Sequence, residues 1–369
     1  MRSYPDLFAK IGVSKEKVRT KIADTFTTMF FDPVERIYCE MGEDKAYMLD
    51  TGNNDARSEG MSYAMMMAVQ MDRKDIFDRL WLFSKTFMYQ KEGKYKGYFA
   101  WSVKRDGTKN SEGPAPDGEE YFAMALFFAS ERWGDGDAPF DYSKQARNIL
   151  LHCIHQAALV KGGEPMWDSG NYLIKFIPES SYSDPSYHLP HFYEIFAQRA
   201  NTQDRPFWKK AAAASREYIA KSCHPVTGMA PEYAEFDGTP IMKFGKTQQF
   251  YSDAYRVAMN IGLDASWNGT TPCLTSSVNR LQVWFSNNTE LGIYDSYMLD
   301  GTPVGIPALH PTAVIATTAA ASLASDNEHR MEWVENFWNT PLRQGDRRYY
   351  DNCLYLFCLM MLGGEYKVY

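Results

Sequence analysis

The sequence predicts an all-α protein, a closed toroid of about twelve helices in which an inner ring is wrapped by an outer one. Apolar residues recur at helical spacing along most of the 369 residues, and the resulting segments follow one another in pairs of about 30 residues. No sustained run of alternating strands is present, which argues against a β-sandwich or a doubly wound sheet. A helical solenoid is the competing architecture, but it would call for a sequence repeat, and none is recognisable.

The individual helices are predicted from apolar periodicity and from start signals. Ser14 stands before Lys-Glu-Lys, with a glutamate in the first turn, and Asp204 precedes an Arg-Pro pair that brings Pro206 near a first helical position. The predicted helices span residues 14–30, 57–71, 74–89, 117–133, 142–159, 186–200, 204–222, 246–261, 264–285, 311–324, 328–338 and 348–362.

The segments between these helices are rich in Gly, Pro and Asp, as expected for loops. Extended stretches at residues 95–103 and 172–177 predict short strands inside such loops. No Ser/Thr/Gly-rich linker divides the chain, so we expect one domain over residues 1–369. In a toroid of this kind, the loops at one rim are the expected place for a functional site.

Composition and charge exclude several classes of function. A net charge of −7 without a Lys/Arg-rich run argues against a nucleic-acid partner. The longest apolar runs, such as residues 123–129, fall short of the roughly 20 residues that span a bilayer, so no membrane partner is expected. The N-terminus lacks an apolar signal core and six cysteines occur without a Cys-x-x-Cys pair, so we expect a cytoplasmic protein with free thiols. Nothing in the sequence indicates a protein partner.

Aromatic residues make up 15% of the chain, a high fraction. Most of them are expected to pack in the core, and others could line a groove in which sugar rings stack on flat aromatic faces. Trp101 is the candidate for such stacking. Packing in the protein core is an equally good explanation for this residue.

Glu59 is the first candidate site residue. A polar, glycine-flanked loop over residues 50–58 runs directly into an apolar helix, and Glu59 and Gly60 lie at the junction. Gly60 is expected to leave the backbone beside Glu59 open to a ligand. A carboxylate at the rim of an apolar pocket would have the raised pKa that a general acid needs. The alternative is a first-turn acid that only stabilises the helix dipole.

Two further carboxylates lie at similar positions. Asp117 stands just before an apolar helix, where it could be a plain N-cap with Glu120 three residues on. Asp253 lies inside an otherwise apolar helical run, with Arg256 one turn later. Two roles are open for Asp253: a structural ion pair with Arg256, or a base that activates water. Three carboxylates at a rim fit glycoside hydrolysis, in which an acid protonates the leaving oxygen and a base activates water or acts as the nucleophile.

Other chemistries find less support. The pairs His152/His155 and His188/His191 have i, i+3 spacing, but neither has a third ligand at regular spacing, so we expect no metal. A G-x-S-x-G elbow for a serine nucleophile is missing, and so are the glycine-rich loops that bind nucleotides. No cofactor is therefore expected.

The segment 115–133 resembles the signature of glycoside hydrolase family 8, roughly A-[ST]-D-[AG]-D-x-x-[IM]-A-x-[SA]-aliphatic with a closing aromatic. Ser-Glu-Gly-Met at 58–61 and Asp-Ala-Tyr-Arg at 253–256 resemble the family's acid and base segments. The three motifs follow in the expected order, and the resemblance covers essentially the whole chain. The residues that match the signature are Ala115, Asp117, Gly118, Ala123, Ala125, Leu126, Ala129 and Trp133, whereas Pro116, Glu119 and Phe122 depart from it.

The resemblance implies an (α/α)6 barrel and an inverting mechanism. Glu59 would be the general acid and Asp253 the general base, two carboxyl groups that inversion places ~6.5–9.5 Å apart. Asp117 would bind and help distort the sugar beside the scissile bond. Arg256 would also bind substrate.

The sequence is similar above all to reducing-end-xylose releasing exo-oligoxylanases, in which a Leu-His-Pro loop blocks the cleft beyond the first leaving-group subsite. Leu309-His310-Pro311 stands at the matching place, so the resemblance implies that His310 hydrogen-bonds the reducing-end sugar. If the family resemblance is set aside, the sequence indicates only that His310 is a histidine in a loop or at a helix cap. Tyr187, in Ser-Asp-Pro-Ser-Tyr-His, would hold the attacking water.

The implied activity is release of xylose from the reducing end of short β-1,4-xylo-oligosaccharides. Endo-acting xylanases or β-1,4-glucanases of the same family, with an open cleft, are the alternative. A non-catalytic sugar-binding barrel is disfavoured, because pure binding needs no acid–base pair of carboxylates.

Overall fold

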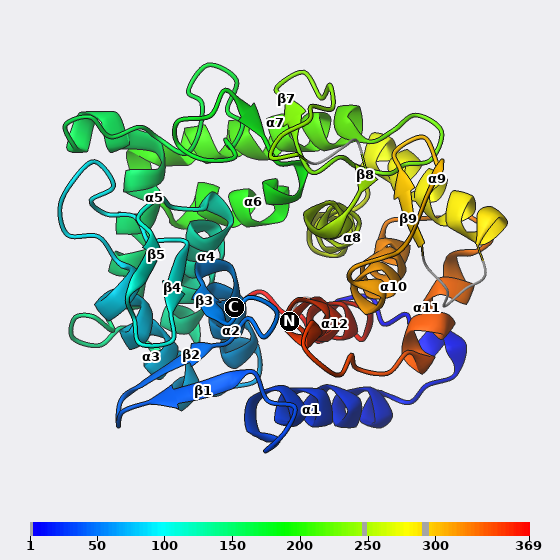
Figure 1. Ribbon diagram of the computed structural model, residues 1–369, viewed down its shortest axis with the longest axis horizontal. Coiled ribbons are helices and arrows are strands. Elements are labelled where there is room, and N and C mark those ends of the chain that lie inside the picture. Colours follow the sequence, from blue (N-terminus) through cyan, green and yellow to red (C-terminus); the bar gives the residue numbers. More distant parts are fainter. Residues whose placement is uncertain (1–2, 246–248, 290–294) are drawn as a thin grey trace.

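The computed structural model describes residues 3–245, 249–289 and 295–369, and over these residues it contains twelve α-helices (Figure 1). The helices are α1 (Lys15–Phe31), α2 (Ser58–Gln70), α3 (Lys74–Phe83), α4 (Pro116–Trp133), α5 (Tyr142–Leu159), α6 (Pro190–Arg199), α7 (Arg205–Ser222), α8 (Arg256–Asn268), α9 (Pro272–Asn288), α10 (Pro311–Ala320), α11 (Arg330–Asn339) and α12 (Arg348–Leu362).

Six of these helices form a closed inner ring. In sequence order α2, α4, α6, α8, α10 and α12 each pack against the next, and α12 packs against α2 to close the ring. The intervening helices lie outside, and each contacts an inner neighbour (Figure 1). The chain is therefore an (α/α)6 barrel, as the sequence predicts.

Burial separates the two rings. Helix α12 is buried from Tyr349 to Leu362, and in α2 every residue except Glu59 is buried. Such helices are apolar all round because protein surrounds them on every side. Outer helices bury one stripe, as α1 does with Val18, Ile22 and Phe26.

Short antiparallel strands lie in the loops between the helices. One three-stranded sheet positions the start of α2, since Ala56 on β3 pairs with Val103 on β4 and α2 begins directly after β3. The strands are β1 (Tyr38–Met41), β2 (Lys45–Met48), β3 (Asp55–Arg57), β4 (Ser102–Lys104), β5 (Lys109–Ser111), β6 (Tyr182–Ser183), β7 (Ala234–Glu235), β8 (Gln249–Phe250), β9 (Asp295–Met298) and β10 (Pro303–Pro307).

Some predicted boundaries are wrong. The helices expected at 246–261 and 264–285 are α8 and α9, which begin later, and residues 246–248 of the first range lie outside the described residues. Gly269, with φ of 92°, ends α8, and Pro272 opens α9, since proline suits a first helical turn. The expected strand at 95–103 begins only at Ser102, and 172–177 contributes only an isolated bridge at Ile174.

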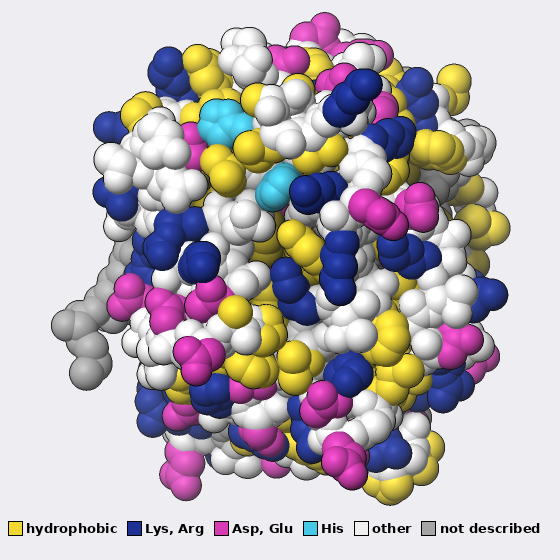
Figure 2. Space-filling model, turned by 90° about the vertical axis from the view of Figure 1, so that its left-hand side faces the viewer, with side chains coloured by type: hydrophobic (Ala, Val, Ile, Leu, Met, Phe, Trp, Pro, Cys, Tyr) yellow, Lys and Arg dark blue, Asp and Glu magenta, His cyan; other side chains and the backbone are white. Residues whose placement is uncertain are grey.

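The outer surface is mixed in character. On the face shown in Figure 2, acidic and basic side chains are interspersed with hydrophobic and other residues. Within the three described ranges, no helix combines the length and the apolar character that crossing a bilayer requires.

Candidate active site

Two adjoining cavities share Arg57, Glu59 and Asp253. The first, here called the aromatic cavity, has a volume of about 390 Å³, and the second, called the His310 cavity, has about 320 Å³. The aromatic cavity is also lined by Ser58, Trp101, Pro114, Ala115, Asp117, Phe176, Ile177, Tyr187, Tyr233, Phe244 and Arg256. The His310 cavity is also lined by Asp50, Asn53, Tyr251, Ser252, Leu309, His310, Arg347, Tyr349 and Tyr350.

Glu59 lies where the two cavities meet, in the first turn of α2. Its Oε1 accepts a hydrogen bond of 2.9 Å from the Tyr349 hydroxyl, and its Oε2 accepts one of 3.2 Å from Arg256 Nη1. Gly60 does not leave space for a ligand, contrary to expectation. A Cβ there would come within 2.3 Å of the Tyr349 hydroxyl, so the missing side chain is what lets Tyr349 reach Glu59.

Burial raises the pKa of Glu59 to about 7. Arg256 opposes this shift, whereas the negative charges of Asp117 and Asp253 add to it. A carboxyl group with this pKa is partly protonated near neutral pH and can donate a proton, as a general acid must.

Asp117 is buried at the second residue of α4, two residues after the N-cap Ala115, so it is not the N-cap that the sequence left open. Its Oδ1 accepts from the backbone N–H of Gly118 at 3.0 Å and its Oδ2 from Arg256 at 3.0 Å. Burial raises the pKa of Asp117 although Arg256 counteracts it. A Cβ on Gly118 would come within 2.5 Å of Ser58 Oγ, so this glycine allows α2 and α4 to bring their acids together.

Asp253 is not inside a helix, contrary to the prediction. It lies in a short 3-10 turn, Ser252–Tyr255, just before α8, and its side chain is 27% exposed. Its Oδ1 is 3.2 Å from Arg256 Nη2, so the i, i+3 ion pair that the sequence left open is present. A partly exposed carboxylate at this point can be reached by water.

Arg256 connects all three carboxylates. One guanidinium nitrogen, Nη1, donates to Glu59, Asp117 and the Tyr63 hydroxyl, and the other, Nη2, pairs with Asp253. Burial alone would lower the pKa of Arg256, but the surrounding acidic groups raise it well above its ordinary value. The guanidinium therefore stays charged and fixes the relative positions of the acids.

Tyr187 lies in the aromatic cavity, with its ring 5.5 Å from the Arg256 guanidinium. Its backbone is held by the Tyr193 hydroxyl, which donates to the Tyr187 carbonyl at 3.2 Å, and by Asn260, which donates to the carbonyl of Ser186 at 2.9 Å. The half-buried Trp101 ring also lines this cavity and faces Arg57 at 5.2 Å. Its partial exposure favours a cavity wall over core packing.

His310 is buried at the N-cap position of α10 and lines the second cavity. Its Nδ1 is 2.8 Å from Asp351 Oδ2, and its ring lies 4.7 Å from that of Tyr350. Sequence reasoning missed Tyr349, Tyr350 and Asp351, which form the start of a predicted helix and carry no signal beyond that.

The histidine pairs are structural. His188 lies between the hydroxyls of Ser183 and Ser215, each at 2.8 Å, and burial lowers the pKa of both His188 and His191 to about 3. His155 pairs with Asp204. The described part of the chain holds no cluster of three or more His, Cys, Asp or Glu side chains suited to a metal ion.

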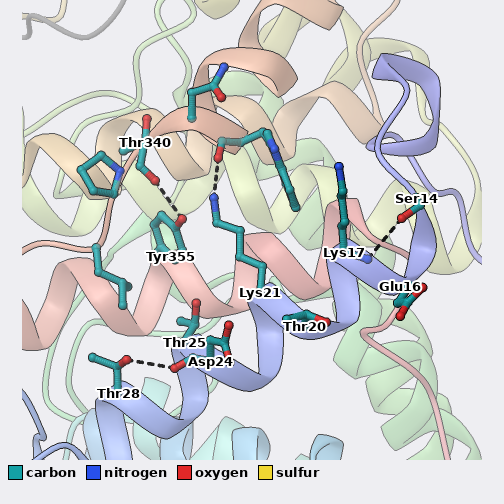
Figure 3. Close-up of a pocket in the computed structure, with 14 residues that line it drawn as sticks. Ser14, Glu16, Lys17, Thr20, Lys21, Asp24, Thr25, Thr28, Thr340 and Tyr355 are labelled. Atoms are coloured by element: carbon teal, nitrogen blue, oxygen red, sulfur yellow. Dashed lines mark hydrogen bonds between the residues drawn. The ribbon is translucent and has the colours of Figure 1, made fainter.

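A larger groove of about 760 Å³ lies elsewhere, between α1 and the segment after α11 (Figure 3). Lys21 crosses it and donates to the Trp338 carbonyl, and Tyr355 donates to that of Thr340. Its two carboxylates, Glu16 and Asp24, are both exposed on α1. Because no buried acid faces another across this groove, it does not offer the chemistry found around Arg256.

Comparison with known proteins identifies the family of the chain. The model of glycosyl hydrolases family 8 matches residues 46–364. The reducing-end xylose-releasing exo-oligoxylanase Rex8A of Paenibacillus barcinonensis is 56% identical over 370 residues, covering 100% of this chain and 97% of Rex8A. A reducing end xylose-releasing exo-oligoxylanase of Halalkalibacterium halodurans is 56% identical over 373 residues, covering 100% and 95%. The structure of Rex8A complexed with xylose matches with a TM-score of 0.96 at 56% identity, over 100% of this chain and 98% of that one. The chain belongs to family 8 of the glycosyl hydrolases.

Proposed function

We propose that this protein is an inverting glycoside hydrolase that releases xylose from the reducing end of short β-1,4-xylo-oligosaccharides. The observation that carries the proposal is the position of Glu59, a carboxyl with a pKa raised to about 7 at the junction of two cavities. The scissile oxygen lies at that junction, with the sugar that is cut in the aromatic cavity and the leaving xylose in the His310 cavity.

In this mechanism Glu59 protonates the leaving oxygen while Asp253 takes a proton from the attacking water. Tyr187 holds that water, and Asp117 binds the sugar beside the scissile bond and helps distort it. Glu59 and Asp253 bind different nitrogens of Arg256, and the inverting mechanism requires room for a water molecule between the two carboxyl groups.

The remaining residues bind substrate. Trp101 offers an aromatic face to a sugar ring in the aromatic cavity. Leu309 and His310 line the other cavity. In the proposal they close it behind a leaving group of one sugar, which His310 hydrogen-bonds. Arg256 contributes by holding the acids and by its place in the cavity wall.

Xylotetraose carrying carbon-13 in its reducing-end sugar tests the proposal. Mass spectrometry should find the label in xylose, with unlabelled xylotriose as the other first product, and proton NMR should show inverted configuration at the new reducing end. Labelled xylobiose as the main first product would instead indicate endo action. Retained configuration would contradict the roles of Glu59 and Asp253.

We also propose the cytoplasm as the location of the protein. All six cysteines are free, and Cys273 is exposed, which suits a reducing compartment. Cell fractionation with an activity assay tests this, and recovery of the activity mainly from the culture medium would refute it.

A further inference from the structure

Leu309 and His310 form one wall of the His310 cavity, and residues outside their loop hold this wall in place. His310 is the N-cap residue of α10, but its side chain does not cap that helix. The cap comes from Asp351 in α12, whose Oδ1 accepts from the backbone N–H of Ala313 at 2.9 Å. Asp351 is fully buried, so this contact is fixed by the barrel core.

The same carboxylate orients the His310 ring. Asp351 Oδ2 is 2.8 Å from His310 Nδ1 and 2.6 Å from Arg343 Nη1. An oxygen that already accepts from a guanidinium acts as an acceptor toward the imidazole as well, so Nδ1 carries the hydrogen of this bond. In the neutral ring Nε2 is then a hydrogen-bond acceptor, suited to a sugar hydroxyl.

Arg343 connects the carboxylate to the loop. Its Nη1 also donates to the carbonyl oxygen of Leu309. Its backbone is fixed in turn by Asn352, which accepts from Arg343 N at 2.9 Å and donates to Arg343 O at 3.0 Å. Leu309 and His310 are therefore both held through Arg343 and Asp351.

The first turn of α12 links this wall to the acid. Tyr349 donates to Glu59, Tyr350 donates to the carbonyl of Ser252 at 2.9 Å, and Asp351 follows directly. The first turn of α12 thus sets the distance between Glu59 and the wall formed by Leu309 and His310.

We propose that Asp351 and Arg343 are positioning residues that keep Leu309 and His310 as a fixed wall and thereby limit the leaving group to one sugar. The inference rests on the proposed function, in which the His310 cavity receives the leaving sugar. It adds the residues that give the wall its rigidity and the histidine its hydrogen-bonding direction.

The test compares Asp351→Asn, Arg343→Met and His310→Ala with the unmodified protein on the labelled xylotetraose and on xylotriose. An asparagine is isosteric, but its single oxygen cannot serve Ala313, His310 and Arg343 together. For Asp351→Asn and Arg343→Met we expect KM for xylotriose to rise about tenfold with kcat within about threefold, since a binding contact is lost. Labelled xylobiose should appear beside labelled xylose.

Arg343→Lys is the conservative variant and should restore part of the selectivity, because an ammonium can still pair with Asp351. Arg330→Met is the matched control. Arg330 donates to the carbonyl of Ser322 at the other end of α10, remote from both cavities, so its loss should leave KM and the labelled products unchanged.

The outcomes separate the two levels of inference. If His310→Ala changes KM and products while both Asp351→Asn and Arg343→Met leave them unchanged, the positioning role is wrong and the proposed function stands. If His310→Ala changes neither, then His310 does not meet the leaving sugar and the positioning role falls with it. Labelled xylobiose as the main product of the unmodified protein would overturn the proposed function itself. If Asp351→Asn does not fold, Arg343→Met alone decides the test. The Arg343 side chain is part-exposed, so we expect its replacement to be tolerated by the fold.

Discussion

At the scale of single residues, the site is organised by one buried cation among three carboxylates. Arg256 can neutralise one negative charge, so in a low-dielectric site the remaining acids compete with one another for ionisation. The Glu59 side chain is 16% exposed and that of Asp253 is 27% exposed, and desolvation raises the pKa of Glu59, so the two carboxyl groups lie in different environments. Two carboxyl groups in unlike surroundings can divide the roles of acid and base.

Replacing Glu59 by glutamine should abolish the chemical step and keep substrate affinity. An amide matches the shape of the carboxylic acid but cannot deliver its proton, so we expect kcat on xylotriose to fall by roughly 10³-fold. Calorimetric titration should give a Kd for xylotriose close to that of the unmodified protein. Glu16→Gln, at an exposed glutamate in the first turn of α1, is the control. Near-normal turnover by Glu59→Gln would remove Glu59 from the mechanism.

The raised pKa of Glu59 predicts an alkaline limb in the pH profile. The acid must be protonated to act, so kcat/KM should be maximal below pH 7 and fall about tenfold per unit above it, where Glu59 loses its proton. The Tyr349 hydroxyl donates to Glu59 and so favours the charged form. Tyr349→Phe should therefore move the limb to higher pH. A limb that stays in place, or moves to lower pH, would argue against this contact controlling the acid.

At the scale of secondary-structure elements, the sequence predicted all twelve helices and their closure into a toroid, but not the side-chain contacts between them. The ranges of α5 and α12 were predicted to the residue. The order of the acidic segments also came from local motifs. Tyr349 and Asp351 could not be found in this way, since Tyr349 bonds Glu59 across 290 positions and local periodicity carries no information on such pairs.

Close helix crossings should be sensitive to a single added methyl group. Gly262 lies where α8 meets the end of α10, and a Cβ there would come within 2.2 Å of the backbone oxygen of Ala320. Since backbone cannot rotate away, Gly262→Ala should lower the free energy of unfolding by about 1–3 kcal/mol in urea denaturation. Gly136→Ala is the control, because its nearest neighbour would be 3.6 Å away. Equal stability of the two variants would show that the crossing can relax.

At the scale of the whole molecule, the ends of the chain meet beside the inner ring. The backbone N–H of Leu7 donates to the carbonyl of Leu362 at 2.8 Å, and Tyr4 accepts from the N–H of Val368 at 2.9 Å (Figure 1). Because α12 packs against α2, the last helix closes a ring that the first inner helix opens. This closure supports the prediction that residues 1–369 form one catalytic domain, which unfolding experiments can test.

A single domain should unfold in one cooperative transition, and a defect in its core should shift that transition as a unit. Tyr366 is suited to such a defect, since it is 2% exposed and its ring lies 5.6 Å from those of Trp267 and Phe357. Tyr366→Ala should lower the free energy of unfolding by about 3–5 kcal/mol, as expected for loss of a buried aromatic side chain. Scanning calorimetry should show one peak at a lower temperature. Lys367→Ala, which removes a side chain 42% exposed to solvent, should leave the peak in place. Two separate peaks, only one of them moved by Tyr366→Ala, would mean that the chain contains more than one folding unit.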